Sequence, residues 1–162
     1  MPQVNSWPRN RRGRPRDSQQ RKVYEAGWEI ASATGWLGER TARSLARTLG
    51  CSMKWSRKNL GLSASGWASY EGRLISINPN MHNAASMEIL LHEVAHVWTY
   101  PDFAAHGAEF CRVLLDLTER VQGWDMRMLL SGAFVRHRVK VAPAGSVRLR
   151  WNLKTWEWPV AK

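Results

Sequence analysis

The sequence predicts an α+β domain in which a small sheet that contains an antiparallel hairpin packs against several helices. Apolar residues recur at helical spacing through 106–121, whereas residues 73–78 (RLISIN) alternate as a strand does. Hydrophobic residues make up 44% of the 162 and charged residues 23%, which is typical of a globular protein. We expect one domain over 17–135, between basic ends at 1–16 and 136–162.

Five helices are expected from apolar periodicity and from residues that begin or end helices. Asp17 or Ser18 can cap the first helix, Pro101 breaks the third, and Gly123 ends the fourth. The last stretch is expected to make only one or two turns. The expected ranges are 17–35, 41–49, 83–100, 106–123 and 126–134.

Three short strands are expected between the second and third helices. They cover 52–55, 67–70 and 73–78, and the Glu71-Gly72 turn joins the last two into an antiparallel hairpin. A further strand pair is expected in the C-terminal segment 136–162, where apolar and basic residues alternate in VRLRW.

The charge of the chain is concentrated at its two ends. The net charge is +11, of which residues 1–22 and 136–162 each contribute +6, so the body is close to neutral. This distribution favours a polyanionic partner, most simply DNA, although basic tails also serve solubility alone. The N-terminal tail, expected to be disordered, includes Arg12, Arg14 and Arg16 within RGRPR, which resembles the core of an AT-hook that enters the minor groove.

Cysteine content and hydropathy exclude several classes of protein. Two cysteines, Cys51 and Cys111, cannot form a disulfide framework or a four-cysteine zinc ribbon. No apolar run approaches the roughly 20 residues that span a bilayer. We therefore expect a protein of the cytoplasm, or of the host cytoplasm if a phage encodes it.

The motif with the most chemical content is HEVAH, residues 92–96. On a helix, His92 and His96 lie on one face, so both imidazoles can bind one metal ion. Glu93 lies close enough to reach a water on that metal and is the candidate catalytic base. Imidazole ligands favour Zn²⁺.

A catalytic zinc takes a third protein ligand and leaves one position for water. His106 is the preferred candidate, because it follows the helix break at Pro101-Asp102 and begins the next helix. It also precedes Gly107, which permits a close approach of the backbone. Asp102 is the alternative third ligand. Glu109, one turn beyond His106, is a candidate to support that ligand by a hydrogen bond.

HEVAH followed by HGAEF (residues 106–110) resembles the SprT-like zincin metallopeptidases, and residues 16–24 look like a group of small metallohydrolases from actinobacteria and their phages. The resemblance covers 16 to about 120. It implies a minimal zincin fold, with His92, His96 and His106 as ligands and Glu93 as base. The C-terminal zinc ribbon of many such proteins has no counterpart here.

These observations lead to a zinc-dependent metallopeptidase that cleaves a protein or peptide by a metal-activated water. A further oxyanion donor is left open among Tyr100, His82 and His137. The alternative is a nucleic-acid-binding protein whose zincin core is mainly structural or regulatory. The resemblance also allows a combination, a peptidase recruited to DNA, and the same site would suit a non-peptide amide.

Overall fold

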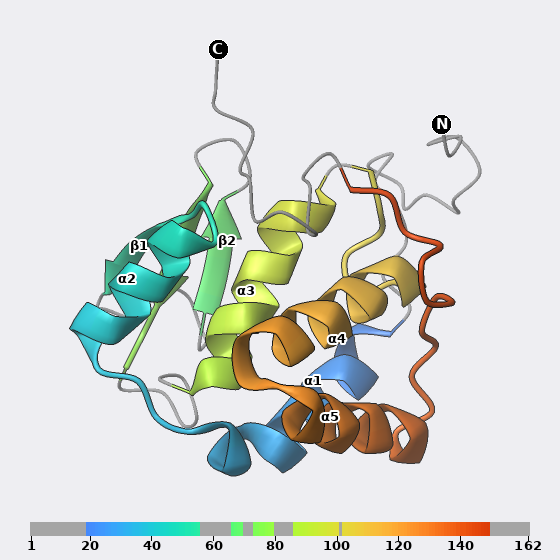
Figure 1. Cartoon of the computed structure of the whole chain (residues 1–162). Helices are drawn as coiled ribbons and strands as arrows, with labels where there is room; N and C mark the ends of the chain where they lie inside the picture. The colour runs from blue at the N-terminus through green and yellow to red at the C-terminus, as the bar shows by residue number, and fades with distance from the viewer. Residues whose placement is uncertain (1–18, 56–65, 70–72, 80–85, 101, 150–162) are drawn as a thin grey trace. The chain divides into compact units, whose positions relative to one another are not determined.

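The computed structural model describes residues 19–55, 66–69, 73–79, 86–100 and 102–149 (Figure 1). The chain forms two compact units. Unit 1 comprises Met1–Ile30 and Thr99–Val147, and unit 2 comprises Ala31–Trp98 and Arg148–Lys162. The expected domain boundaries at residues 16 and 135 stay predictions.

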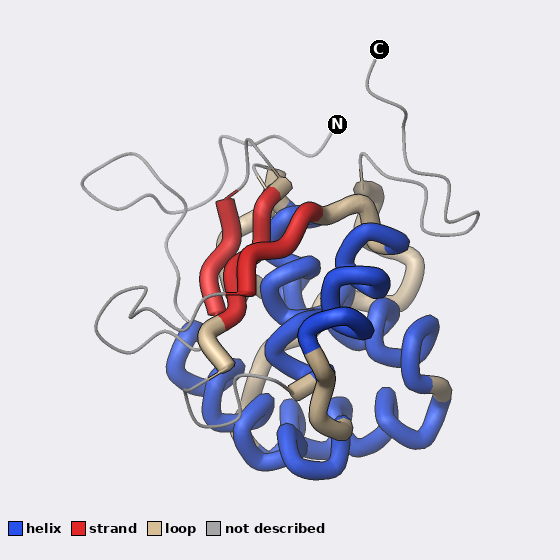
Figure 2. Tube along the Cα trace, turned by 90° about the vertical axis from the view of Figure 1, so that its left-hand side faces the viewer, coloured by secondary structure: helices blue, strands red, loops and turns tan. Residues whose placement is uncertain are grey.

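Unit 2 contains a mixed three-stranded sheet of order β1-β3-β2, whose strands lie side by side in Figure 2. The strands are β1 (Ser52–Trp55), β2 (Gly66–Ser69) and β3 (Leu74–Ile77). β2 pairs with β3 antiparallel, which confirms the expected hairpin. β1 pairs with the other edge of β3 and runs parallel to it, a pairing that strand periodicity does not reveal.

Helix α2 (Glu39–Thr48) packs on this sheet beside β1. Its buried side comes from Ala42 and Ala46, continued by Leu49, whereas Leu45, expected inside, is only partly buried. The indole N–H of Trp98, near the end of α3 (Met87–Thr99), donates to the Leu49 carbonyl at 3.0 Å. This bond fixes the end of α2 to the helix that carries HEVAH.

Unit 1 contains α1 (Gln20–Ile30), α4 (Ala108–Gln122) and α5 (Trp124–Arg136), and α5 packs against both other helices. α5 is 13 residues long, so the expectation of one or two turns was wrong. Exposed Met128 and Val135 obscure its apolar stripe in the sequence, while Leu130 and Phe134 are buried by packing. Tertiary contacts therefore set its length.

The other expected elements lie within a few residues of their predicted positions, with two differences. α1 gives way at Ala31 to a 3-10 turn that ends at Thr34, and α3 starts at Met87 rather than near 83. The described C-terminal segment 139–149 contains no strand, against expectation. Asp17, Ser18, Pro101 and residues 150–162 lie outside the described residues, as does the RGRPR segment.

Candidate metal centre

Helix α3 carries the histidine pair of HEVAH and is buried along most of its length. Ser86 begins it as an N-cap, because its Oγ accepts the backbone N–H of Ile89 at 3.3 Å. His92 and His96 follow at i and i+4, and they are only 1% and 7% exposed. Such burial of two polar rings requires that their nitrogen atoms have partners.

The two rings already have a separation suited to sharing a cation. Their Nε2 atoms lie 3.1 Å apart, and their centroids lie 4.8 Å apart. Two nitrogens bound to a tetrahedral zinc at 2.0–2.1 Å would be separated by about 3.3 Å. The spacing of the pair thus fits zinc ligation through both Nε2 atoms.

His106 belongs to a turn of unit 1 just before α4, and its backbone φ is +53°. A histidine costs about 1 kcal/mol or more in this left-handed region, so the surrounding contacts must hold it there. The buried Gln19 side chain donates to the His106 carbonyl at 3.1 Å. The imidazole packs between Tyr24 and Phe110, each with a ring centroid at 5.1 Å.

Gly107 completes this turn by allowing the chain to pass close to itself. Its N–H bonds to the Ala104 carbonyl at 3.0 Å. A Cβ on residue 107 would lie 3.1 Å from that oxygen and 3.2 Å from the Ala104 Cβ. The expectation that Gly107 serves a close approach of the backbone is confirmed.

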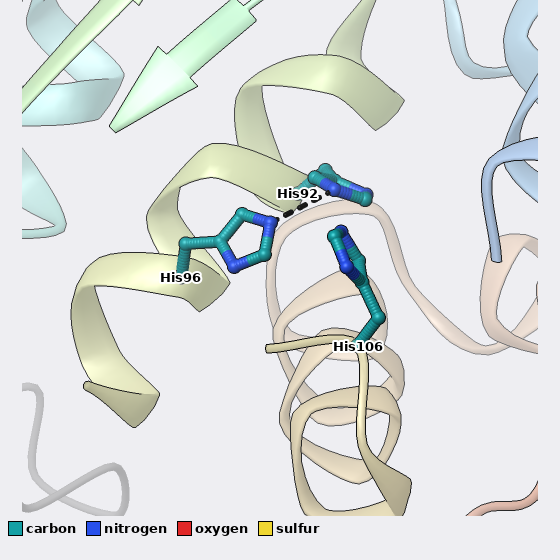
Figure 3. A group of neighbouring side chains, drawn as sticks. All are labelled: His92, His96 and His106. Atoms are coloured by element: carbon teal, nitrogen blue, oxygen red, sulfur yellow. Dashed lines mark hydrogen bonds between the residues drawn. The ribbon is translucent and has the colours of Figure 1, made fainter. Parts of the chain in front are cut away.

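His92, His96 and His106 form a group whose ligand atoms all lie within 4.8 Å of one another (Figure 3). All three are buried, and among the described residues no other such group is present. The cluster could hold a metal ion. Three neutral imidazoles with a fourth position for water are the donor set of several catalytic zinc sites, so the residues fit zinc.

Glu93 follows His92 on α3 and is 4% exposed. Burial raises the pKa of its carboxyl group to about 8, and the neighbouring negative charge of Glu88 adds to the effect. A carboxyl group with this pKa exchanges protons near neutral pH, as a general base or acid must.

Glu88 was missed by the motif analysis. It lies one turn before His92, is 4% exposed, and places Oε1 3.8 Å from His92 Nδ1. Since His92 directs Nε2 towards His96, its other ring nitrogen is the one that faces this carboxylate. Burial raises the Glu88 pKa to about 8. The spacing of Glu88 from His92, i and i+4 on the same helix, was the available signal.

Neither of the other two candidates for the metal site on this part of the chain, Asp102 and Glu109, is a member of this group. Asp102 is partly buried and is not a member of the histidine cluster. Glu109 has a buried Oε2 without a hydrogen-bond partner in the described part of the chain, so its support of His106 stays a prediction. Tyr100 is 48% exposed, His137 binds Glu29 at 2.8 Å, and His82 lies outside the described residues.

The family model of the SprT-like family matches residues 35–129, which is more than half of the chain. The chain belongs to the SprT-like family. This family is of the HExxH zincin metallohydrolase type, so the resemblance and the α+β fold expected from it are confirmed. No curated protein and no solved structure matches the chain.

The match begins just after the 3-10 turn that follows α1 and extends into α5, so it includes every residue of the histidine cluster. Its boundaries leave out both basic ends of the chain. The expected actinobacterial or phage relationship stays a prediction. Within the described residues, no helix is long and apolar enough to cross a membrane.

Proposed function

We propose that this SprT-like protein is a zinc-dependent metallopeptidase. The observation that supports this most strongly is the gathering of three buried imidazoles beside a buried glutamate on the same helix as two of them. A purely structural metal site would not need Glu93 next to its ligands. His92, His96 and His106 would hold the ion, as their residue types and spacing suggest.

Zinc, when bound, supplies Lewis acidity and lowers the pKa of a water towards ~7. Residues of the chain transfer the proton and orient the candidate ligands. Glu93 accepts the proton as the water attacks a peptide carbonyl, and the carboxylic acid then delivers that proton to the leaving amine. Glu88, beside His92 Nδ1, would keep the ring oriented with Nε2 towards the ion.

The direct test is Glu93→Gln, assayed on an unfolded protein substrate together with measurement of bound zinc. We expect hydrolysis to fall by about 10²-fold or more, because general-base catalysis is lost, while the zinc content is unchanged. Glu119→Gln, near the end of α4 and outside the histidine cluster, is the matched control and should keep most of the activity. Full activity in Glu93→Gln would refute the catalytic assignment.

We also propose, as a second function, that the basic ends bind DNA and recruit the peptidase to it. The charge of +6 at each end supports this, as does the Arg-Gly-Arg-Pro-Arg sequence at 12–16. Deleting residues 1–16 should weaken DNA binding and make it less dependent on salt. Equal binding by the full chain and the truncated chain would exclude Arg12, Arg14 and Arg16 from the interface.

A simple nucleic-acid-binding protein with a structural zinc site is the competing interpretation. It predicts zinc binding and DNA binding without hydrolysis of any peptide or amide substrate. Assays on casein and on a DNA-bound protein, each with and without DNA, distinguish it from the peptidase. Hydrolysis that depends on both Glu93 and DNA would support the combined function.

A further inference from the structure

A second feature of unit 2 lies outside the histidine cluster. A cavity of about 530 Å³ opens between the C-terminal half of α2, β1 and the turn before β3. Its described lining includes Arg43, Arg47 and Arg73, and no carboxylate is among these described residues. We call it the arginine cleft.

The charges of the nearly neutral body are divided unevenly between the two units. In unit 1, Arg112 forms an ion pair with Asp116 of α4. Arg127 forms ion pairs with Asp116 and with Glu119 of the same helix. In the described part of unit 2, only Glu39 is an exposed acid, since Glu88 and Glu93 are buried. The neutrality seen in the sequence therefore conceals a basic surface.

Helix geometry gathers this charge on one side of α2. Arg40, Arg43 and Arg47 are spaced at i, i+3 and i+7, which places them on one exposed face. Lys54 on β1 is exposed as well. The opposite face of α2 is the buried one, so these cations cannot turn inward.

The fold positions two of the three arginines, Arg43 through its guanidinium group and Arg73 through its backbone. Arg43 Nη1 donates to the Met53 carbonyl at 2.6 Å, and its Nε and Nη2 donate to Glu39 Oε1. These bonds use three of its five N–H groups, so two remain. Arg73 is partly buried, has a φ of +48°, and accepts the Ser52 N–H at its carbonyl. A guanidinium group that is oriented in advance loses less entropy on binding.

Arg47 differs from these two. It is exposed, and within the described residues its guanidinium forms no hydrogen bond or ion pair. A structural role could account for an arginine at this position, because Arg47 lies in the last turn of α2, where a cation offsets the helix dipole. That dipole amounts to about half an elementary charge, however, and Glu39 adds one more. The three guanidinium groups carry more charge than both together, so the described lining of the cleft has a net positive charge.

We propose that the arginine cleft is a phosphate-binding site. Arginine forms paired hydrogen bonds to phosphate oxygens, and several guanidinium groups around one opening match a group with two or three anionic oxygens. A nucleic-acid backbone and a free phosphate present the same chemistry. The described lining of the cleft shares no residue with the basic ends of the chain or with the candidate zinc ligands.

The test uses the full chain and a fluorescein-labelled single-stranded 20-mer, with binding followed by anisotropy over a range of salt concentrations. In Arg47→Gln/Arg73→Gln we expect binding to weaken about tenfold or more. The slope of log affinity against log salt should fall by about 1.4, since each lost phosphate contact on a single strand contributes about 0.7. Arg43 is left in place because the fold uses its bonds.

Arg120→Gln is the control matched to Arg47→Gln alone, since it removes one positive charge from an exposed residue of α4 that is not among the lining residues of the cleft. It should change affinity by less than about twofold. Arg47→Gln alone provides a second variant that disturbs no contact of the described residues. Circular dichroism and zinc content verify folding of each variant.

A second arm titrates inorganic phosphate and follows the amide resonances of Gly50 and Ser52, which line the cleft. If phosphate shifts these resonances in the wild type but not in the double variant, while oligonucleotide binding is the same in both, the site is supported and its ligand is free phosphate. Weakened oligonucleotide binding in the cleft variants would assign it to nucleic acid. No effect in either arm, or an equal effect of Arg120→Gln, would overturn the proposal. Neither arm measures zinc binding or hydrolysis, so the outcome is independent of the peptidase assignment.

Discussion

Helix α3 and the turn at 104–107 both supply histidines to the candidate metal centre, but different interactions hold them. The α3 pair depends on local geometry, because i and i+4 on any helix bring two rings together. His106 depends on Gln19, 87 residues away in sequence, and on the close passage of Gly107 over Ala104. The comparison shows that helical spacing positions two of the candidate ligands and that tertiary contacts position the third.

The largest expected effect comes from removing ligands of each kind. His96→Ala and His106→Ala should each weaken zinc binding by about 100-fold or more, since a zinc site of about 10–16 kcal/mol is shared among few ligands. Competition with a chelating dye measures the affinity. Asp102→Asn should bind zinc as the wild type does. If His106→Ala bound zinc tightly and Asp102→Asn bound it weakly, the third ligand would be Asp102 instead of His106.

The support of the turn by Gln19 is tested by Gln19→Ala. This side chain donates to the carbonyls of His106 and Lys140 and accepts the Lys140 N–H. Losing one buried and two partly buried hydrogen bonds at about 1 kcal/mol each should lower the free energy of unfolding by about 2–3 kcal/mol and also weaken zinc binding. Urea denaturation measures the first effect. Gln20→Ala, at an exposed neighbour, is the control and should change little.

A smaller effect is expected at Gly107, where the turn leaves little room for a side chain. Gly107→Ala introduces a Cβ too close to the backbone oxygen of Ala104, so we expect a loss of about 1–2 kcal/mol and weaker zinc binding. Gly132→Ala, inside α5, meets only the flexible end of Arg136. It should stabilise the protein by up to about 1 kcal/mol through helix propensity. Thermal unfolding measures the Tm of both variants. Equal changes in Tm would contradict the expected difference between them.

The smallest effect concerns the ion pairs between α1 and α5. Arg136 and His137 lower the pKa of Glu29 from its ordinary value of 4.5. The Glu29 carboxylate therefore stabilises the fold above pH 4.5, and this contribution disappears as pH falls through the lowered pKa. Glu29→Gln should reduce Tm slightly at neutral pH and not at all in acid. A difference that persists in acid would assign the effect to packing.

Patterns of short range were enough to predict much of the site and part of the fold. The i, i+4 spacing of His92 and His96 and their placement on a buried helix followed from local periodicity. The antiparallel hairpin of β2 and β3 followed from a turn between two short alternating runs. Each of these depends on residues a few positions apart, whose geometry the backbone dictates directly.

Other features depended on contacts between distant segments. The parallel pairing of β1 with β3 and the full length of α5 have no local pattern strong enough to predict them. The i, i+4 spacing of Glu88 and His92 is a local pattern, but the burial of Glu88 depends on packing. The same holds for the arginine cleft, because a neutral total charge over 23–135 does not show which charges pair.

The sequence by itself determined the chemistry of the metal centre, through the choice of imidazole and carboxylate groups and through the helical repeat that presents them. Only the tertiary structure decided where His106 lies, that Glu88 is buried beside His92, and which arginines share one opening. The physical reason is that spacing along a helix is fixed by backbone hydrogen bonds within one turn. The meeting of distant side chains depends instead on the packing of the whole chain.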